Sequence, residues 1–174
     1  MNNYSEKFEK MRIAGKLASQ TLDMLTDHVN PGVSTDKIDQ LGYEFINDNG
    51  GHSAPLYYRG FKKSLCTSLN HVVCHGIPSD RVLIDGDIVN IDVTAIVNDY
   101  YGDTSRMFAI GDISIKAKNL IDATYESMMK AITIQFVRTS AWPLQQAYMR
   151  ELKPPGSACS MFALASSKWR ATCS

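Results

Sequence analysis

Two aspartates in this chain, Asp92 and Asp103, have the chemistry to bind divalent metal ions. They lie in the stretch IVNIDVTAIVNDYYGDTSRMF, residues 88–108, which is typical of two β-strands. The dipeptide Asn98-Asp99 stands between the strands and favours a tight hairpin turn. Carboxylate oxygens are ligands for hard and borderline metal ions, so the pair can hold one or two cations if the fold brings it together.

The hairpin register decides whether the two carboxylates meet. With a two-residue loop, Thr94 faces Asp103 across the strand pair. Asp92 then faces Ser105. Directly opposed residues share a face of the sheet, and side chains alternate with period two. Asp92, Thr94 and Asp103 therefore lie on one face, with the α-carbons of the two aspartates roughly 7–8 Å apart.

An ordinary surface strand would show the same pattern, because polar residues often line the solvent face of an antiparallel sheet. A register shift of one residue would also place the two carboxylates on opposite faces. The other face of the first strand is apolar and consists of Val89, Ile91, Val93, Ala95 and Val97. This pattern predicts a half-buried strand and leaves open whether the aspartate face meets solvent or a binding site.

Three motifs around these aspartates resemble bacterial type I methionine aminopeptidases. They are SLNHVVCHGIP (68–78), DGDIVNIDVT (85–94) and YGDTSRMF (101–108), and the similarity runs from about Ser5 to Ile134. The resemblance implies an α/β (α+β) chain with an antiparallel sheet and covering helices. Such a chain would make up half to two thirds of a pita-bread, creatinase/aminopeptidase-like fold.

The resemblance also implies an activity, the removal of the initiator methionine from the N-termini of nascent polypeptides. Members of the family use two divalent ions, Co, Mn, Fe or Zn, to lower the pKa of the attacking water. By this correspondence Asp92 chelates one metal and Asp103 bridges both. Asn90 and Thr94 share the Asp92 face and would hydrogen-bond the ligand carboxylates, although ordinary strand polar residues would look the same.

The resemblance gives His75, in the motif CHGIP, a catalytic and substrate-binding role. The family histidine faces the substrate amide, and an imidazole donor beside developing oxyanion charge favours the transition state. Without the resemblance, a lone histidine is more often structural or a surface residue. His71 is expected to be only a strand neighbour.

Tyr58, Phe61 and Cys66 match positions of the family's pocket for the methionine side chain. A flexible thioether packs well against aromatic edges and a thiol. The alternative is that Tyr57, Tyr58 and Phe61 are core aromatics. Phe61 stands where a tyrosine is common in the family, and Pro55 where a cysteine is common, so the selectivity of such a pocket stays open.

The chain departs from the family pattern after about residue 136. Complete relatives carry one further His ligand and two further Glu ligands. The histidines of this chain all lie before the departure, at His28, His52, His71 and His75. After Glu126 the only acidic residue is Glu151. We therefore expect weak or absent metal binding and little activity from this chain alone. The alternative function is that of a non-catalytic pita-bread binding module or pseudoenzyme fragment.

Charge divides the chain at the same place. Residues 1–136 hold 13 Lys/Arg and 17 Asp/Glu, a formal net charge of −4, whereas residues 137–174 hold 5 and 1, a net charge of +4. We expect residues 1–136 to be the amino-terminal part of a methionine aminopeptidase domain. Residues 137–174 are expected to be a disordered or poorly packed tail outside the family, produced by a frameshift or, alternatively, by an evolved extension.

Composition excludes several other classes. The charged amino terminus is unlike a secretory signal, and no apolar run approaches the roughly 20 residues needed to cross a membrane. The four cysteines lack zinc-site spacing, and the sparse basic residues form no patch suited to nucleic acid. We expect a cytoplasmic protein with no nucleic-acid or membrane partner. Self-association is expected through sheet and helix surface that the other half of the fold would cover.

Periodicity predicts the elements that position these residues. A first helix is expected over 5–29, with inward positions at Phe8, Met11, Ala14, Ala18, Leu22 and Leu25. A second helix should be capped by Ser34 or Thr35 and stop at residues 49–51. Strands are expected near 64–73, 82–97 and 100–109. A third helix is expected over 116–134, with Leu120, Ile121, Met128 and Ile132 inward.

Overall fold

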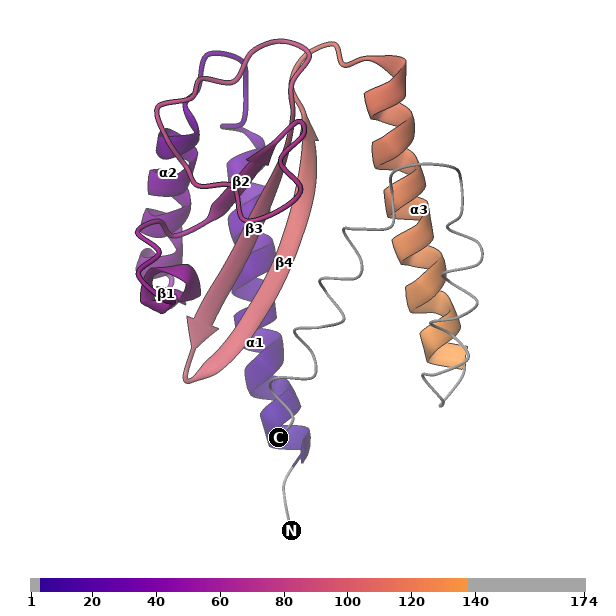
Figure 1. Cartoon of the computed structure of the whole chain (residues 1–174). Coiled ribbons are helices and arrows are strands. Elements are labelled where there is room, and N and C mark those ends of the chain that lie inside the picture. The colour runs from indigo at the N-terminus through magenta and orange to yellow at the C-terminus, as the bar shows by residue number, and fades with distance from the viewer. Residues whose placement is uncertain (1–3, 138–174) are drawn as a thin grey trace. The chain divides into compact units, whose positions relative to one another are not determined.

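A computed structural model describes residues 4–137 and divides the chain into two compact units, residues 1–113 and 114–174. The described part of the first unit contains two α-helices, a short 3-10 helix and an antiparallel sheet, and the described part of the second unit is one α-helix (Figure 1). The predicted boundary at residue 136 falls at the limit of the described residues, and the predicted tail lies outside them. No helix of the described part is both long and apolar enough to cross a membrane.

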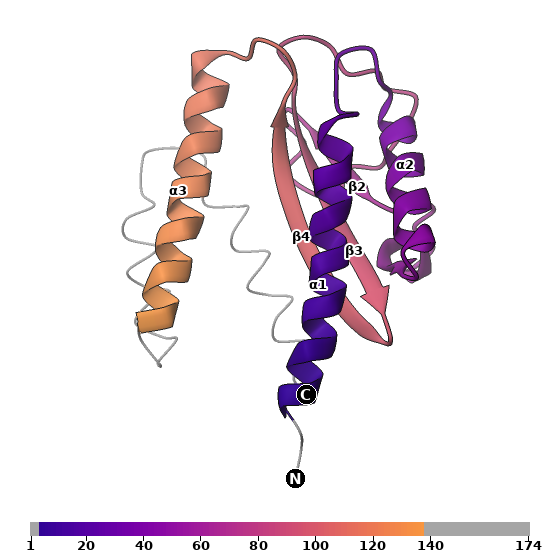
Figure 2. The ribbon, with the colours of Figure 1, turned by 180° about the vertical axis from the view of Figure 1, so that it is seen from behind.

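Helix α1 (Tyr4–Thr26) packs on the sheet through small and branched side chains spaced three or four residues apart. Its buried face comprises Ala14, Leu17, Ala18, Leu22 and Leu25, each at most 5% exposed. Phe8 and Met11, which we predicted to point inward, are 55% and 48% exposed. The first turns of α1 extend past the β3–β4 hairpin (Figures 1 and 2), so the helical pattern begins before the helix is covered by the sheet.

Helix α2 (Thr35–Asp48) begins and ends where the sequence predicts. Ser34 has extended backbone angles, and its side chain accepts a hydrogen bond from the Lys37 amide at 3.2 Å, which satisfies one of the free amides of the first turn. Gly50 has a φ of 75° and allows the chain to leave the helix. The α2 face toward the core buries Ile38 and Ile46 completely.

The sheet consists of β1 (His52–Ser53), β2 (Cys66–Leu69), β3 (Ile88–Val97) and β4 (Tyr100–Ala109), with a short 3-10 helix, η1 (Ala54–Tyr57), after β1. All pairs are antiparallel: β1 and β2 both pair with one edge of β3, and β4 pairs with the other. The β4 range agrees with the prediction, but β3 starts later than predicted. Leu83 instead exchanges backbone hydrogen bonds with Val33 and Gly32, at 2.9 and 2.8 Å.

One face of the sheet forms the hydrophobic core with α1 and α2. Val89, Ile91, Val93 and Ala95 on β3 are all fully buried and point to this face. Figures 1 and 2, which view the first unit from opposite sides, show both helices on the same side of the sheet. The alternating side chains of β3 therefore leave Asn90, Asp92 and Thr94 on the face that neither helix covers.

The contact between α1 and β4 requires glycine at residue 102. Gly102 is buried, and a β-carbon there would lie 2.2 Å from the carbonyl carbon and oxygen of Ala14. The backbones of the helix and the strand therefore approach more closely than any side chain would allow. Arg106 joins the same two elements, because its guanidinium donates to the Asp23 carboxylate at 2.7 Å and to the Thr26 hydroxyl at 3.1 Å.

Helix α3 (Ile115–Val137) is the described element of the second unit. Ser114 precedes it, and its hydroxyl accepts a hydrogen bond from the Ala117 amide at 3.2 Å. Leu120 and Ile132, predicted to point inward, are 40% and 43% exposed, while Ile121 and Met128 are half-buried. The predicted burial is wrong for the first two, because the described part of this unit offers the apolar stripe no second element to pack against.

Candidate metal centre

The hairpin that carries the two aspartates has the register expected from the sequence. Asn98 and Asp99 both have positive φ, 50° and 68°, as the two-residue type I′ turn requires. Thr94 pairs with Asp103, and Asp92 pairs with Ser105. The alternative of a shifted register is therefore excluded, and both carboxylates belong to the same face of the sheet.

A hydrogen bond links the two strands directly at the candidate site. The Thr94 hydroxyl donates to one carboxylate oxygen of Asp103 at 2.9 Å. This bond orients the carboxylate while its other oxygen and the remaining lone pairs stay available as acceptors. Asp92 is half-buried and Asp103 is exposed, so the pair spans the boundary between the protein and solvent. Asn90 lies further along the same face, opposite Met107 on β4 and Ser68 on β2.

Cys66 is the predicted pocket residue that the fold brings directly beside an aspartate. It pairs with Asp92 from the β2 side, so the two side chains share a face. Cys66 is 8% exposed, and Asp92 is half-buried beside it. The register therefore places a thiol and a carboxylate side by side on one face of the sheet.

The loop between β2 and β3 brings the segment that contains His75 alongside β2. The next residue, Gly76, lies on the outer edge of β2, where its carbonyl accepts a hydrogen bond from the Thr67 amide at 2.8 Å. The segment with His75 is thus one strand spacing from β2 and two from β3, about 10 Å from the strand of Asp92. His75 is exposed and has a φ of 54°, a left-handed conformation that is uncommon for a residue with a side chain.

The two predicted pocket aromatics lie on the segment between η1 and β2. Tyr58 is 64% exposed, and Phe61 is half-buried. The Arg59 guanidinium lies over the Tyr58 ring, 5.4 Å from its centroid. Tyr57 is 73% exposed, so the alternative interpretation of this segment as core aromatics is wrong for Tyr57 and Tyr58. Their exposure leaves them available to a ligand.

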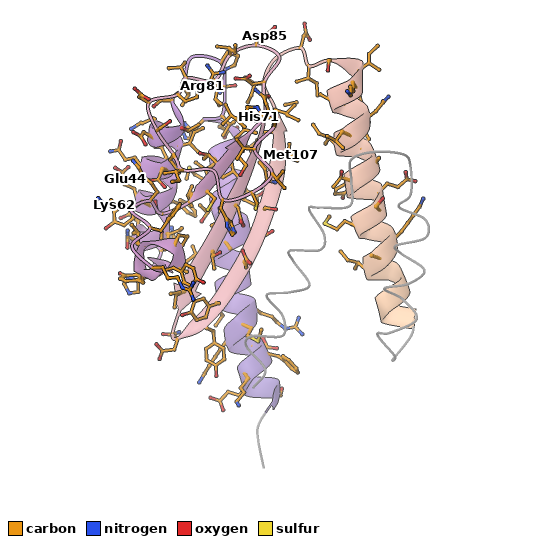
Figure 3. The ribbon with its side chains drawn as sticks, in the orientation of Figure 1. Glu44, Lys62, His71, Arg81, Asp85 and Met107 are labelled. Carbon is orange, nitrogen blue, oxygen red and sulfur yellow. The ribbon has the colours of Figure 1, made fainter. Side chains whose placement is uncertain are left out.

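The connection from β2 to β3 contains His71, Arg81 and Asp85, which Figure 3 labels above the sheet. His71 was predicted to be a strand neighbour, but β2 ends at Leu69 and His71 lies in the loop. The strand ends there because Asn70 turns into the left-handed region, with a φ of 49°. The side-chain oxygen of Asn70 then accepts a hydrogen bond from the Ile88 amide at 3.1 Å, in place of a backbone carbonyl, and its side-chain amide donates to Asp87 at 2.9 Å.

Two further residues fix β2 and could not be identified as site residues from the sequence. Asp39 on α2 is 8% exposed, and one of its carboxylate oxygens accepts hydrogen bonds from the Ser64 amide, the Ser64 hydroxyl and the Leu65 amide, all at 2.8 Å. Ser68 is buried on the Asp92 face, and its hydroxyl accepts a hydrogen bond from the Gly76 amide at 3.1 Å. For the Asp39 contacts, the one sign in the sequence is an aspartate on the inner face of an amphipathic helix.

The donor set suits part of a metal site. Two carboxylates on one face, one of them oriented by a hydroxyl, are oxygen ligands of the kind that Mn, Fe, Co and Zn accept. Within residues 4–137 no group of three or more His, Cys, Asp or Glu side chains is placed to hold a metal ion. The described residues therefore fit two ligands of a larger set.

Comparison with known proteins identifies the family. The model of metallopeptidase family M24 matches residues 9–162. Methionine aminopeptidase of Rickettsia prowazekii is 58% identical over 132 residues, which cover 75% of this chain and 51% of that protein. The Escherichia coli K12 methionine aminopeptidase is 49% identical over 129 residues, covering 73% and 49%. The chain thus spans about half the length of the curated relatives it matches.

Solved structures agree with the sequence comparison. The crystal structure of the Rickettsia prowazekii methionine aminopeptidase superposes with a TM-score of 0.72 at 58% identity, over 74% of this chain and 52% of that one. An Xaa-Pro dipeptidase from Bacillus anthracis superposes with a TM-score of 0.63 at 21% identity, over 72% and 34%, and shares the fold. The chain therefore belongs to metallopeptidase family M24, and its described part is a portion of the pita-bread fold.

Proposed function

We propose that this chain provides one half of a dinuclear metal site that removes N-terminal methionine from nascent polypeptides, with Asp92 and Asp103 as metal ligands. The observation that carries the proposal is the hairpin register, which places both carboxylates on one face and gives Asp103 a hydroxyl donor from Thr94. The similarity to methionine aminopeptidases over three quarters of the chain supports the same reaction.

The residues of this chain would have distinct tasks in that reaction. Two divalent ions, when bound, supply an activated water and polarise the first peptide carbonyl. Asp92 and Asp103 would be ligands of these ions, while Thr94 holds the Asp103 carboxylate in place. His75 would donate a hydrogen bond toward the oxygen on which negative charge develops, which favours the transition state. Asn90 would support the ligand carboxylates from the same face.

The substrate side chain would lie against Cys66, Tyr58 and Phe61. Cys66 is adjacent to Asp92, so a thioether held there would place the peptide bond near the carboxylates. The exposed face of Tyr58 and the half-buried Phe61 would provide the aromatic edges. Such a pocket selects an unbranched apolar side chain by shape and by contact with sulfur.

We further propose that the isolated chain binds metal weakly and turns over little substrate. Affinity falls with the number of ligands, and two carboxylates leave several coordination positions to water. The family's remaining His and Glu ligands have no counterpart that we can name in the sequence. General base catalysis alone contributes roughly 10²–10⁴-fold, so the absence of a Glu base would suppress turnover even with metal present.

Metal titration of three variants tests the carboxylate site. Calorimetry with Mn²⁺ should give weak binding to the wild-type chain and a further loss in Asp92→Asn and Asp103→Asn. Asp99→Asn is the matched control, because it removes the same charge from the turn of the same hairpin and leaves the face unchanged. Equal affinity in all four proteins would reject the site. Tight binding of two ions would show that this chain holds ligands beyond the two aspartates.

A peptide assay tests the activity. Residues 1–174 should release no detectable methionine from a Met-Ala-Ser peptide with added Co²⁺ or Mn²⁺, and addition of a separate carboxyl-terminal half from a relative should restore some release. Turnover by this chain alone, abolished by Asp103→Ala, would reject the proposed inactivity and support the metal site.

A binding module without catalysis is the second candidate, favoured by the lack of a three-ligand group in residues 4–137. Peptide binding that is independent of metal would support it.

A further inference from the structure

The segment that carries His75 is joined to β2 at Gly76. The Gly76 carbonyl accepts a hydrogen bond from the Thr67 amide at 2.8 Å, and the Gly76 amide donates to the Ser68 hydroxyl at 3.1 Å. The first bond is between backbone groups, so any sequence could form it. The second depends on the side chain of Ser68, which is 4% exposed and lies on the same face as Asp92.

Close packing makes this junction stiff. A β-carbon on Gly76 would lie 2.1 Å from the Thr67 carbonyl oxygen and 2.9 Å from the α-carbon of Ser68. The backbone of the loop therefore rests directly on the backbone of the strand. A change at the Ser68 hydroxyl is transmitted to the loop because no flexible side chain lies between them.

This junction lies next to the unusual backbone conformation of His75. The His75 φ of 54° is left-handed, a conformation that is unfavourable for a residue with a side chain. Strained conformations persist where the surrounding structure holds them. The Ser68 hydroxyl holds the amide immediately after His75, and so acts on the backbone that sets the direction of the imidazole.

We propose that Ser68 is a positioning residue for His75, fixing the imidazole relative to the Asp92 and Asp103 carboxylates through the Gly76 amide. The proposal rests on the proposed function, because it gives His75 its role beside a metal-bound substrate. Ser68 itself would touch neither metal nor substrate. Loss of its hydroxyl should move or loosen His75 while the hairpin with both aspartates stays intact.

The chain contains a matched control for the loss of this hydroxyl. Thr67 is the neighbour of Ser68 and is equally buried, at 4% exposure, but its hydroxyl has no hydrogen-bond partner in the structure. Thr67→Val removes that hydroxyl at nearly constant volume and keeps the backbone amide that binds Gly76. Ser68→Ala removes the hydroxyl that accepts from Gly76. The two variants thus differ in whether the deleted oxygen is bonded to the His75 segment.

The test is nuclear magnetic resonance on the full ¹⁵N-labelled chain with Mn²⁺ as the probe. In the wild type, Mn²⁺ should broaden the amides of Asp92, Asp103 and His75. The effect falls with the sixth power of distance, so a change of about a tenth in the distance between Mn²⁺ and the His75 amide changes it about twofold. Ser68→Ala should alter the His75 effect by at least that factor and leave both aspartates unchanged, whereas Thr67→Val should alter none of the three.

Hydrogen exchange gives a second readout that needs no metal. Loss of one hydrogen bond should speed exchange of the Gly76 amide by roughly two- to tenfold in Ser68→Ala, with no change in Thr67→Val. Unchanged His75 broadening or unchanged Gly76 exchange in Ser68→Ala would overturn the proposal. If Ser68→Ala does not fold, exchange of the Gly76 amide in the wild type tests the proposal. Exchange as fast as that of exposed loop amides would overturn the role of Ser68.

Failure of the proposed function has a different signature. In that case Mn²⁺ would broaden neither Asp92 nor Asp103 in the wild type. The positioning role is then decided by residual dipolar couplings of the N–H bonds at residues 75–77, measured against those of β3. A changed orientation of these bonds in Ser68→Ala and not in Thr67→Val supports the role of Ser68, and the same orientation in all three proteins rejects it.

Discussion

Replacing Gly102 by alanine should strongly destabilise the first unit, because the new methyl group would occupy space held by the backbone of α1. The added β-carbon would lie 2.2 Å from the carbonyl carbon and oxygen of Ala14 and 2.3 Å from the Gly15 nitrogen, whereas ordinary contact begins near 3.4 Å. All three atoms are backbone atoms, so no side chain can rotate away. Either α1 or β4 must therefore move by roughly 1 Å.

The size of the effect follows from what α1 buries. Leu17, Ala18 and Leu22 pack into the core from the same helix, and a shift of α1 loosens all of them. Overpacking typically costs about 1–3 kcal/mol, and the rigid backbone contact places Gly102→Ala near the upper end of that range. Gly15→Ala is the matched control, because nothing lies within 4 Å of its β-carbon position and alanine in a helix interior should stabilise by about 0.5–1 kcal/mol.

Urea denaturation followed by circular dichroism measures both changes. The added methyl group should lower the urea midpoint in Gly102→Ala and raise it in Gly15→Ala. If Gly102→Ala leaves too little folded protein, the double variant with Gly15→Ala provides a measurable background. An unfolding midpoint for Gly102→Ala equal to that of the wild type would refute the close approach of α1 and β4.

Three further changes have defined outcomes. Thr94→Val removes the donor to Asp103 and should weaken Mn²⁺ binding by roughly tenfold in calorimetry, while an unchanged affinity would separate Thr94 from the site. Asp99→Gly relieves a side chain at a φ of 68° and should raise stability by up to about 1 kcal/mol in urea denaturation; destabilisation would count against the type I′ turn. The hydrogen bond to Asp36 raises the pKa of Lys63 above its ordinary value of 10.5. The stabilisation from this ion pair is therefore complete below pH 10.5 and is lost as the pH rises through the pKa of Lys63 in the folded state. Asp36→Asn should therefore flatten the alkaline fall in melting temperature, and an identical pH profile would reject the contribution of this pair.

The hairpin could be predicted from the sequence because several local signals agree. Asn98-Asp99 favours the turn, and the apolar residues of β3 alternate in the phase that buries one face. A two-residue loop leaves one register compatible with both signals, and this register puts Thr94 opposite Asp103. The position of the two carboxylates therefore follows from about twenty consecutive residues.

The surroundings of β2 could not be predicted in the same way. The strand is shorter than expected because contacts distant in sequence determine both of its ends. Ser64 and Leu65 are bound by Asp39, about 25 residues away, and Asn70 is bound by Asp87. A pattern of apolar residues carries no record of such polar contacts, so the predicted strand over 64–73 included residues that the structure places in loops.

Helix periodicity predicts which face of a helix is apolar, but not how far its partner extends. The pattern of α1 continues through Phe8 and Met11, whereas burial begins at Ala14, where the helix meets the sheet. In α3 the apolar stripe is present, but Leu120 and Ile132 are still 40% and 43% exposed. Burial requires a second surface that covers the helix, and the sequence of a helix describes only its own apolar face.

The different origins of these contacts imply that the parts of the candidate site differ in stability. Asp92 and Asp103 are held by ten consecutive pairs of one hairpin, from Val97–Tyr100 to Ile88–Ala109, whereas His75 depends on a loop fixed through Gly76. Local opening is easiest where few buried contacts hold a segment. Partial unfolding should therefore release His75 first and leave the two carboxylates paired. The metal binding proposed for the aspartates should then persist under conditions in which the imidazole no longer has a fixed position, so the proposed roles of the aspartates and of His75 can be tested separately.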